Sequence, residues 1–211
     1  MNVLAFDTAS PASSVALLAA GVLFEESLPP ERGASEDLLP AVERCLRRAG
    51  LPFSRVDRLA ACSGPGSFTG LRVGLATAWG LARAGGIPLE GVSTLEAMAE
   101  ASRATGLQTV TTALGAGRGE IVVGTFRIDG PRGIGIGPPR RLTEEQTRVL
   151  ALRETLVTLP AGLVPGCLSL TQAPASALAS AVARAPRPVE GAPPRAVYSR
   201  PSAAEEKRGA P

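Results

Sequence analysis

The most informative part of the sequence is the segment Cys62–Ala84, which reads CSGPGSFTGLRVGLATAWGLARA. An apolar run ends in a glycine-rich turn, and the remainder predicts a helix that ends at about Ala84. Residues four apart share a helix face, so Gly70, Gly74, Ala78 and Ala82 form one stripe of small side chains. Each internal glycine costs a helix about 1 kcal/mol relative to alanine. We therefore expect another backbone to pack closely against this stripe.

The stripe beside it carries large apolar side chains, namely those of Phe68, Leu71, Leu75 and Trp79. A helix that is apolar on more than one side lies either inside its own chain or partly against a partner. The sequence leaves both interpretations open. We expect the partner interpretation, with an interface that also includes a second predicted helix and that comprises Leu39, Val42, Leu46, Gly70, Leu71, Gly74, Ala78 and Ala82.

The turn before this helix suggests a weak anion site. Ser67 at the helix start offers a hydroxyl beside free N–H groups, which is the arrangement that binds phosphate. Asp7 and Thr8 follow the first predicted strand, and together with Ser67 they are the phosphate candidates. The alternative is that Ser67 caps the helix and Asp7 forms a turn. The alternative is favoured, because the lysine of a P-loop is missing and the spacing differs.

Composition excludes several classes of protein. The 211 residues are 45% hydrophobic and 19% charged, which argues against wholesale disorder. There is no histidine, and the three cysteines lie far apart, so the commonest general base and the usual zinc motifs are missing. We expect no catalytic residue, no metal and no cofactor. The apolar runs are too short to cross a membrane and no secretion signal is visible, so we expect a cytoplasmic protein.

The basic residues slightly outnumber the acidic ones, 22 against 19, and aromatic residues make up only 3% of the chain. Single-stranded RNA is typically read by stacking on aromatic side chains, so direct RNA recognition is weakly supported. If arginines contribute, we expect Arg44, Arg47 and Arg48 to contact phosphates.

Hydrophobic periodicity predicts two α/β lobes, 1–104 and a smaller 105–211 with a Pro- and Ala-rich tail. The first lobe should contain a meander of three strands, then helix-linked strands, at 2–8, 13–20, 22–27, 36–49 (helix), 57–63, 68–84 (helix), 88–92 and 94–104 (helix). The second should echo it with strands at 107–114, 120–128, within 134–142 and at 162–168, one helix bearing Val149, Leu152, Leu156 and Leu159, and a last helix at 175–185.

Helix ends are also predicted. Asp37 should cap the helix that contains Pro40, since proline is harmless only in the first turn. Capping boxes are expected at Ser93 with Glu96 and at Thr143 with Gln146.

A family resemblance follows from several segments. The block GPGSFTGLRVG at 64–74, continued by 76–78 and 80–82, resembles the signature of the TsaB (YeaZ) family. The first strand and turn, LAFDTAS at 4–10, resembles that family too, as do Leu38–Pro40, Gly91–Ala97 and Val197–Pro201. The match is dense from residue 2 to about 100 and sparse beyond.

The resemblance implies a two-lobe fold of the actin/Hsp70/hexokinase (ribonuclease H-like) class, with mixed sheets and a reduced second lobe. It implies a non-catalytic subunit in the synthesis of N6-threonylcarbamoyladenosine at position 37 of tRNA. The expected partners are a paralogous TsaD-type transferase, a TsaE-type ATPase and tRNA within the complex only. The same interface is expected to support a homodimer. TsaD-type proteins carry a His-x-x-x-His metal motif, which a chain without histidine lacks.

The chain departs from the family pattern at three positions. Ala34 replaces a usual histidine, and Gly115 and Gly117 stand where Asp and Arg are usual. Carboxylates on the first strand of each lobe hold metal in nucleotide-using relatives, and here only Asp7 remains. The alternative function, an independent nucleotide-dependent phosphotransferase, is therefore disfavoured. A glycoprotease is disfavoured as well, because the chain has no zinc-binding helix motif.

Overall fold

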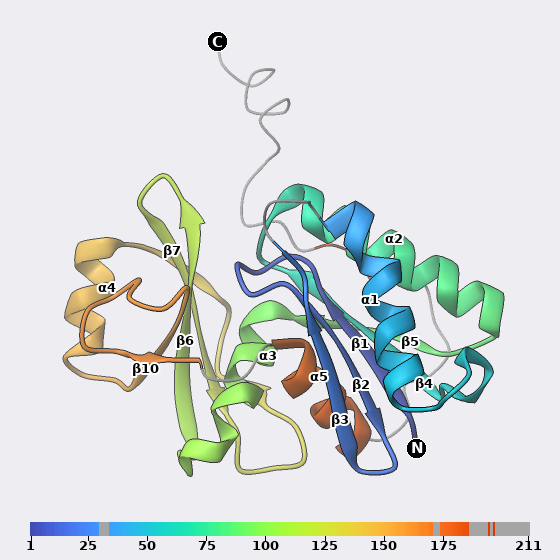
Figure 1. The fold of residues 1–211 in the computed structure, drawn as a ribbon. Coiled ribbons are helices and arrows are strands. Elements are labelled where there is room, and N and C mark those ends of the chain that lie inside the picture. The colour runs from blue at the N-terminus through green and yellow to red at the C-terminus, as the bar shows by residue number, and fades with distance from the viewer. Residues whose placement is uncertain (30–33, 171–173, 186–193, 195, 197–211) are drawn as a thin grey trace.

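The computed structural model describes residues 1–29, 34–170, 174–185, 194 and 196. Within these residues the chain forms two β-sheets and five layers in the order helices, sheet, helices, sheet, helix (Figure 1). None of the helices in this part of the chain is long and apolar enough to cross a bilayer. The family segment at 197–201 and the end of the Pro- and Ala-rich tail lie outside the described residues.

The first sheet confirms the predicted meander and its parallel extension. Its strand order is β3-β2-β1-β4-β5. The first three strands are antiparallel, whereas β4 and β5 run parallel to β1. The strands are β1 (Val3–Asp7), β2 (Ser14–Ala19), β3 (Val22–Ser27), β4 (Arg58–Gly64) and β5 (Leu89–Ser93).

The second sheet repeats this topology with two long central strands, β6 and β7, and short strands on either side of them. Its order is β11-β10-β6-β7-β8, in which β6, β7 and β8 are antiparallel and β10 and β11 run parallel to β6. A further strand, β9, pairs with β7. The predicted two-lobe α/β fold with mixed sheets and a reduced second lobe is confirmed. The strands are β6 (Thr109–Gly117), β7 (Glu120–Arg127), β8 (Ile134–Gly135), β9 (Arg140–Thr143), β10 (Leu156–Leu159) and β11 (Leu168–Ser169).

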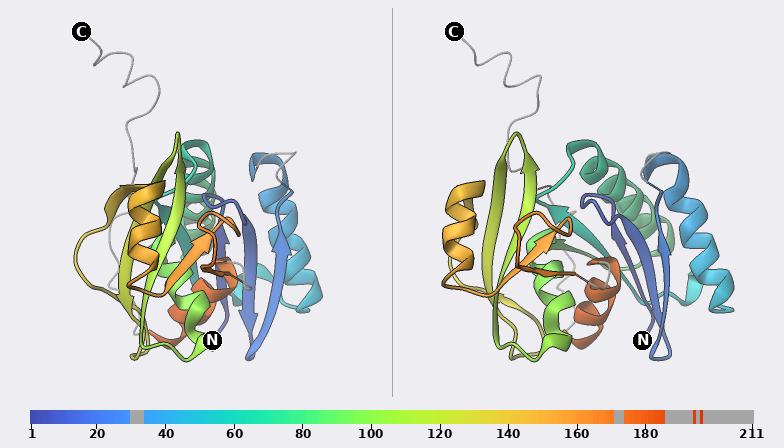
Figure 2. Two further views of the ribbon diagram at one scale, coloured as in Figure 1. Left: turned by 90° about the vertical axis from the view of Figure 1, so that its left-hand side faces the viewer. Right: turned by 60° about the vertical axis from the view of Figure 1, so that its left-hand side comes forward.

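The helices cover both faces of each sheet (Figure 2). Alternate residues of β1 point to opposite sides: Leu4 and Phe6 pack under α1 and α2, and Val3 and Ala5 pack against α5. Helix α3 lies between the sheets and packs against β6 and β7, while α4 covers the outer face of the second sheet. The helices are α1 (Ala34–Arg48), α2 (Phe68–Gly85), α3 (Thr94–Ala101), α4 (Glu144–Ala151) and α5 (Pro174–Arg184), with short 3-10 turns at Phe53–Arg55 and Ser102–Thr105.

The last helix returns to the first sheet. Although α5 comes from the second half of the chain, it contacts β1, β2 and α3. The boundary near residue 105 stays a prediction, since the chain crosses back between the two lobes after it.

Two of the predicted helix ends are wrong. The Ser93 hydroxyl makes no capping hydrogen bond, and the Glu96 carboxylate, expected to complete the capping box, pairs with Arg132 instead. Helix α1 already begins at Ala34, so Asp37 is not its cap and Pro40 lies inside the helix. Proline removes one backbone donor from the helix, while its neighbours Leu38 and Ala41 are buried in the core. The capping box of Thr143 and Gln146 is confirmed.

The predicted helix with Leu156 and Leu159 on one face is also wrong. Helix α4 ends at Ala151, and Leu156–Leu159 form strand β10, which is buried and pairs with β6 in parallel. A short continuous apolar run is typical of a strand buried on both faces, and local periodicity does not separate it from a helix. The strand predicted at 162–168 is reduced to β11.

Candidate partner-binding face

The turn after β1 is organised by the carboxylate of Asp7, which is fully buried. One oxygen accepts from the backbone N–H groups of Ala9 at 3.0 Å and Ser10 at 3.1 Å, and the other accepts from the Ser10 hydroxyl. Burial raises the pKa of Asp7, and these hydrogen bonds act in the opposite direction. The side chain therefore shapes a turn whose N–H groups point inward to it.

The next part of the turn lies in a groove that glycines open in α2. The Thr8 hydroxyl donates to the carbonyl oxygen of Gly70 at 2.7 Å. A Cβ on Gly70 would overlap the Thr8 carbonyl oxygen, and a Cβ on Gly74 would overlap the Thr8 hydroxyl. The close approach of a backbone, which the two glycines predicted, is thus an approach by this chain itself.

The three phosphate candidates come together at this turn, but each is already engaged within the chain. Ser67 accepts from the N–H of Gly70 at 3.2 Å, which caps α2, and its own N–H donates to the Ala9 carbonyl at 2.8 Å. Thr8 is held by α2 and Asp7 is held by the turn. The geometry accordingly favours the structural interpretation of Asp7, Thr8 and Ser67 over phosphate binding.

The expected interface along the small-residue stripe requires a correction. Gly70, Leu71, Gly74, Ala78 and Ala82 are all buried within the single chain. They face β1 and the core that α2 shares with the first sheet. A partner does not reach these residues, because the sheet of the same chain already occupies that side.

The opposite side of α2 is exposed, and two of its residues, Ala76 and Gly80, are small. Arg72, Ala76 and Gly80 follow one another at four-residue steps and are exposed, while Val73 and Thr77 beside them are half-buried. A Cβ added at Gly80 would meet nothing within 4 Å. The guanidinium of Arg72 stacks on Phe68 at 3.8 Å from the ring centroid, which fixes one end of this ridge.

On α1, only one of the three expected interface residues is available. Leu39 is 49% exposed, Val42 is buried in the core and Leu46 is half-buried. Helices α1 and α2 contact each other in the outermost layer (Figure 1), and each has an exposed side, which carries Leu39 on α1 and Ala76 and Gly80 on α2. We call these exposed sides the α1–α2 outer face, consisting of Leu39, Pro40, Val73, Ala76, Thr77 and Gly80.

The arginines expected to reach RNA phosphates are mostly occupied. Arg44 pairs with Glu26 at 2.8 Å, and Arg48 pairs with the same carboxylate at 2.7 Å. These contacts hold the pKa of Glu26 below its usual value. Arg47 remains exposed at the end of α1.

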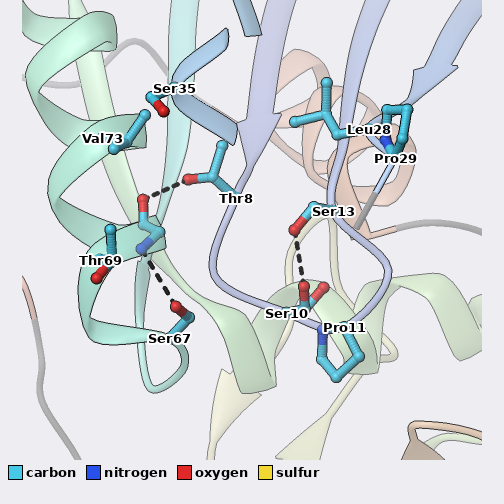
Figure 3. Close-up of a pocket in the computed structure, with 11 residues that line it drawn as sticks. Thr8, Ser10, Pro11, Ser13, Leu28, Pro29, Ser35, Ser67, Thr69 and Val73 are labelled. Carbon is cyan, nitrogen blue, oxygen red and sulfur yellow. Dashed lines mark hydrogen bonds between the residues drawn. The ribbon is translucent and has the colours of Figure 1, made fainter. Parts of the chain in front are cut away.

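A pocket of about 320 Å³ opens beside the turn, at the starts of α1 and α2 (Figure 3). Its lining is uncharged, with hydroxyl groups from both helices and from the turn. Four of these hydroxyl groups already form hydrogen bonds within the chain, namely those of Thr8, Ser10, Ser13 and Ser67. Sequence reasoning missed this pocket, because the chain brings Ser35 to Val73 only in three dimensions.

Gly115 and Gly117, which stand where the family usually has Asp and Arg, lie on the β6–β7 hairpin. Gly117 and Gly119 adopt positive φ angles of 76° and 74° on either side of Arg118. A Cβ on Gly115 would lie 3.3 Å from Leu163.

The cysteine of β4, Cys62, is buried, and burial raises the pKa of its thiol well above the usual value. Because the thiolate is the nucleophilic form, this thiol is not a ready nucleophile. In the described ranges no cluster of three or more potential ligand side chains forms a metal site.

Comparisons with known proteins place the chain in a family. The model of the family "TsaD: tRNA N6-adenosine threonylcarbamoyltransferase" matches residues 28–138. The chain is similar to the tRNA threonylcarbamoyladenosine biosynthesis protein TsaB of Escherichia coli, with 38% identity over 61% of this chain and 56% of that protein. The TsaB protein of Haemophilus influenzae is 41% identical over 48% of this chain and 43% of that protein.

The chain thus spans about half the length of the curated relatives it matches. A solved structure titled YeaZ from Pseudomonas aeruginosa superposes with a TM-score of 0.73 at 30% identity, covering 86% of this chain and 90% of that chain. Because the family model spans more than half of the chain and the YeaZ structure is matched over nearly its full length, the chain belongs to the TsaB (YeaZ) family, within the broader family that the TsaD model describes.

Proposed function

We propose that the chain is a non-catalytic subunit in the synthesis of N6-threonylcarbamoyladenosine in tRNA, where it supports a TsaD-type transferase. The pathway is that of its relatives, which are named as tRNA threonylcarbamoyladenosine biosynthesis proteins. The chemistry of the chain agrees with a supporting role: it has no histidine, and Asp7, Thr8 and Ser67 are engaged in its own structure.

The observation that carries the proposal is the α1–α2 outer face. Ala76 and Gly80 leave the backbone of α2 bare on its exposed side, so a partner helix can approach to short range. The apolar side chain of Leu39, half exposed, offers a contact for such a helix. Protein–protein interfaces typically have an apolar centre of this kind surrounded by a polar rim. Glu43 and Arg72, both exposed, supply charged groups at its border.

The test is co-elution with a TsaD-type transferase that carries a His-x-x-x-His motif. In Ala76→Arg, a long charged side chain stands on the bare ridge, and we expect binding to weaken at least about tenfold, or 1.4 kcal/mol. The control is Ala161→Arg, which makes the same change at an exposed alanine beyond β10. Equal binding by both variants, with both folded by circular dichroism, would contradict the proposal.

The remaining assignments belong to the same proposal. A TsaE-type ATPase and tRNA join through the complex, the chain acts in the cytoplasm, and the outer face supports a homodimer when the transferase is missing. Disruption of that homodimer by Ala76→Arg, but not by Ala161→Arg, is the expected result in analytical ultracentrifugation.

The competing function, an independent nucleotide-dependent phosphotransferase, is tested by calorimetric titration of the isolated chain with Mg-ATP. Tight binding accompanied by turnover would refute the non-catalytic role. The proposal expects neither, because the turn's N–H groups of Ala9 and Ser10 already donate to Asp7.

A further inference from the structure

The loop between β7 and β8, residues 128–133, joins two strands of the second sheet and contacts α3 and β5. We call it the strap. Arg103 donates to the carbonyl oxygens of Ile128 at 2.5 Å and Gly130 at 2.9 Å. Arg184, at the end of α5, donates to the Pro131 carbonyl at 3.0 Å. Arginines of two different helical segments therefore bind the backbone carbonyl groups of the strap.

The centre of these contacts is the carboxylate of Glu100 on α3, whose side chain is only 1% exposed. It accepts two hydrogen bonds from Arg103, both at 2.8 Å, and one from Arg184 at 2.5 Å. It also accepts the backbone N–H of Gly133 at 2.5 Å. One buried side chain thus joins α3, α5 and the strap.

The strap continues the network into the first sheet through Arg132. Its guanidinium pairs with Glu96 on α3 and with Glu90 on β5. Glu90 also pairs with Arg58 of β4 at 2.9 Å, and Arg58 is 1% exposed. The Nη1 atom of Arg58 donates to the carbonyl oxygen of Val182, near the end of α5, at 2.6 Å.

A buried charge cluster is a poor source of net stability, because desolvation of the ions offsets most of their attraction. Packed apolar residues would hold the same elements at least as firmly. What charged groups add is directional contact, since each hydrogen bond is satisfied at only one relative position of strap, α3, α5 and β5. The strap lies at the end of the sheets opposite the β1–β2 turn (Figure 1). In that turn, Ala12 packs against the core of the second sheet.

We propose that the strap and its ion cluster are a lock that holds the two lobes in a single relative orientation. The two sheets then move as one body, and no opening and closing about a hinge takes place when a small ligand is present. This inference does not depend on the identity of the partner, so failure of the lock and failure of the proposed function are separate results.

The lock is tested by the distance between spin labels on the two outermost layers. Labels are placed at Glu43→Cys on α1 and Glu145→Cys on α4, both exposed, in a Cys167→Ser background, since Cys45 and Cys62 are buried. The expected result is one narrow distance distribution that saturating Mg-ATP leaves unchanged. A broad distribution, or a shift with nucleotide, would overturn the proposal.

Two variants weaken the lock, Glu100→Gln and Arg132→Met, and each is expected to widen the distribution at least about twofold. The control is Arg127→Met at the end of β7, which removes an ion pair with Asp129 of the strap; both side chains are about half exposed, and the pair does not bridge the lobes. An unchanged width in both folded lock variants would overturn the proposal.

A measurement on the unaltered chain keeps the proposal testable if these variants fail to fold. Amide hydrogen exchange reports how often the Gly133 N–H leaves Glu100. We expect Gly133 to exchange as slowly as the central amides of β6, because the lock opens only with the whole molecule. Exchange at least about tenfold faster than β6 would show that the strap opens locally, and would overturn the lock.

Discussion

The same substitution at two glycines of α2, Gly74→Ala and Gly80→Ala, should have opposite effects on stability. Alanine is better than glycine in a helix by about 1 kcal/mol. At Gly80 the new methyl group meets nothing within 4 Å, so the gain should appear in full. At Gly74 the methyl group would overlap the Thr8 hydroxyl, which must then move.

Moving Thr8 has two costs. Overpacking of a tight core contact is destabilising by about 1–3 kcal/mol. Loss of the buried hydrogen bond from Thr8 to the Gly70 carbonyl, 2.7 Å long, adds about 1 kcal/mol. After the propensity gain is subtracted, Gly74→Ala should lower the unfolding free energy by about 2 kcal/mol.

Urea denaturation followed by circular dichroism measures both variants, and thermal melts should agree. For a chain of this size about 1 kcal/mol corresponds to about 2–4 °C, so Gly74→Ala should melt about 4–8 °C lower and Gly80→Ala about 2–4 °C higher. If Gly74→Ala proves as stable as Gly80→Ala, Thr8 does not pack against α2 closely enough to require a glycine at position 74, and the reasoning is refuted.

Three further predictions concern individual contacts. Thr143→Ala should lower the unfolding free energy by about 1 kcal/mol by removing a capping bond, whereas Ser93→Ala, which removes none, should stay within about 0.5 kcal/mol. Arg58→Met should lower the unfolding free energy by about 3 kcal/mol, because it removes the hydrogen bond to the Val182 carbonyl of α5 and the ion pair with Glu90; a value near zero in urea denaturation would contradict this reasoning. Arg44 lowers the pKa of Glu26, so the folded carboxylate adds stability above its usual pKa of 4.5 and loses it as the pH falls through the lower folded value. Glu26→Gln should therefore destabilise at about pH 6, with a difference from wild type that shrinks toward about pH 3.

Local patterns identified most of the elements. The short apolar runs in 2–8 and 13–20 predicted strands that the structure contains, and the close spacing of these runs predicted the meander. The apolar run Leu156–Leu159 was wrongly joined to the preceding helix. Its state depends on pairing with β6, a partner about 45 residues away along the chain that periodicity does not register.

Charged residues were the least predictable from sequence. Glu96 was expected to complete a capping box and instead binds Arg132, 36 residues away. Arg44 and Arg48 looked available to RNA, but both meet Glu26 of β3. Long charged side chains reach several neighbours, and which one they choose depends on the positions of elements that lie far apart in the chain.

The sequence by itself determined the family, the succession of helices and strands, and the need for a backbone close to Gly70 and Gly74, because each rests on short-range sterics and motif spacing. Only the tertiary structure decided which backbone that is. Both sides of α2 carry small or apolar residues, so its orientation depends on the order of the strands beneath it, and the sheet takes the stripe of Gly70 and leaves Ala76 and Gly80 outside. The surface that we propose for a partner is therefore on the exposed side of the helix, opposite to the stripe that the sequence predicted.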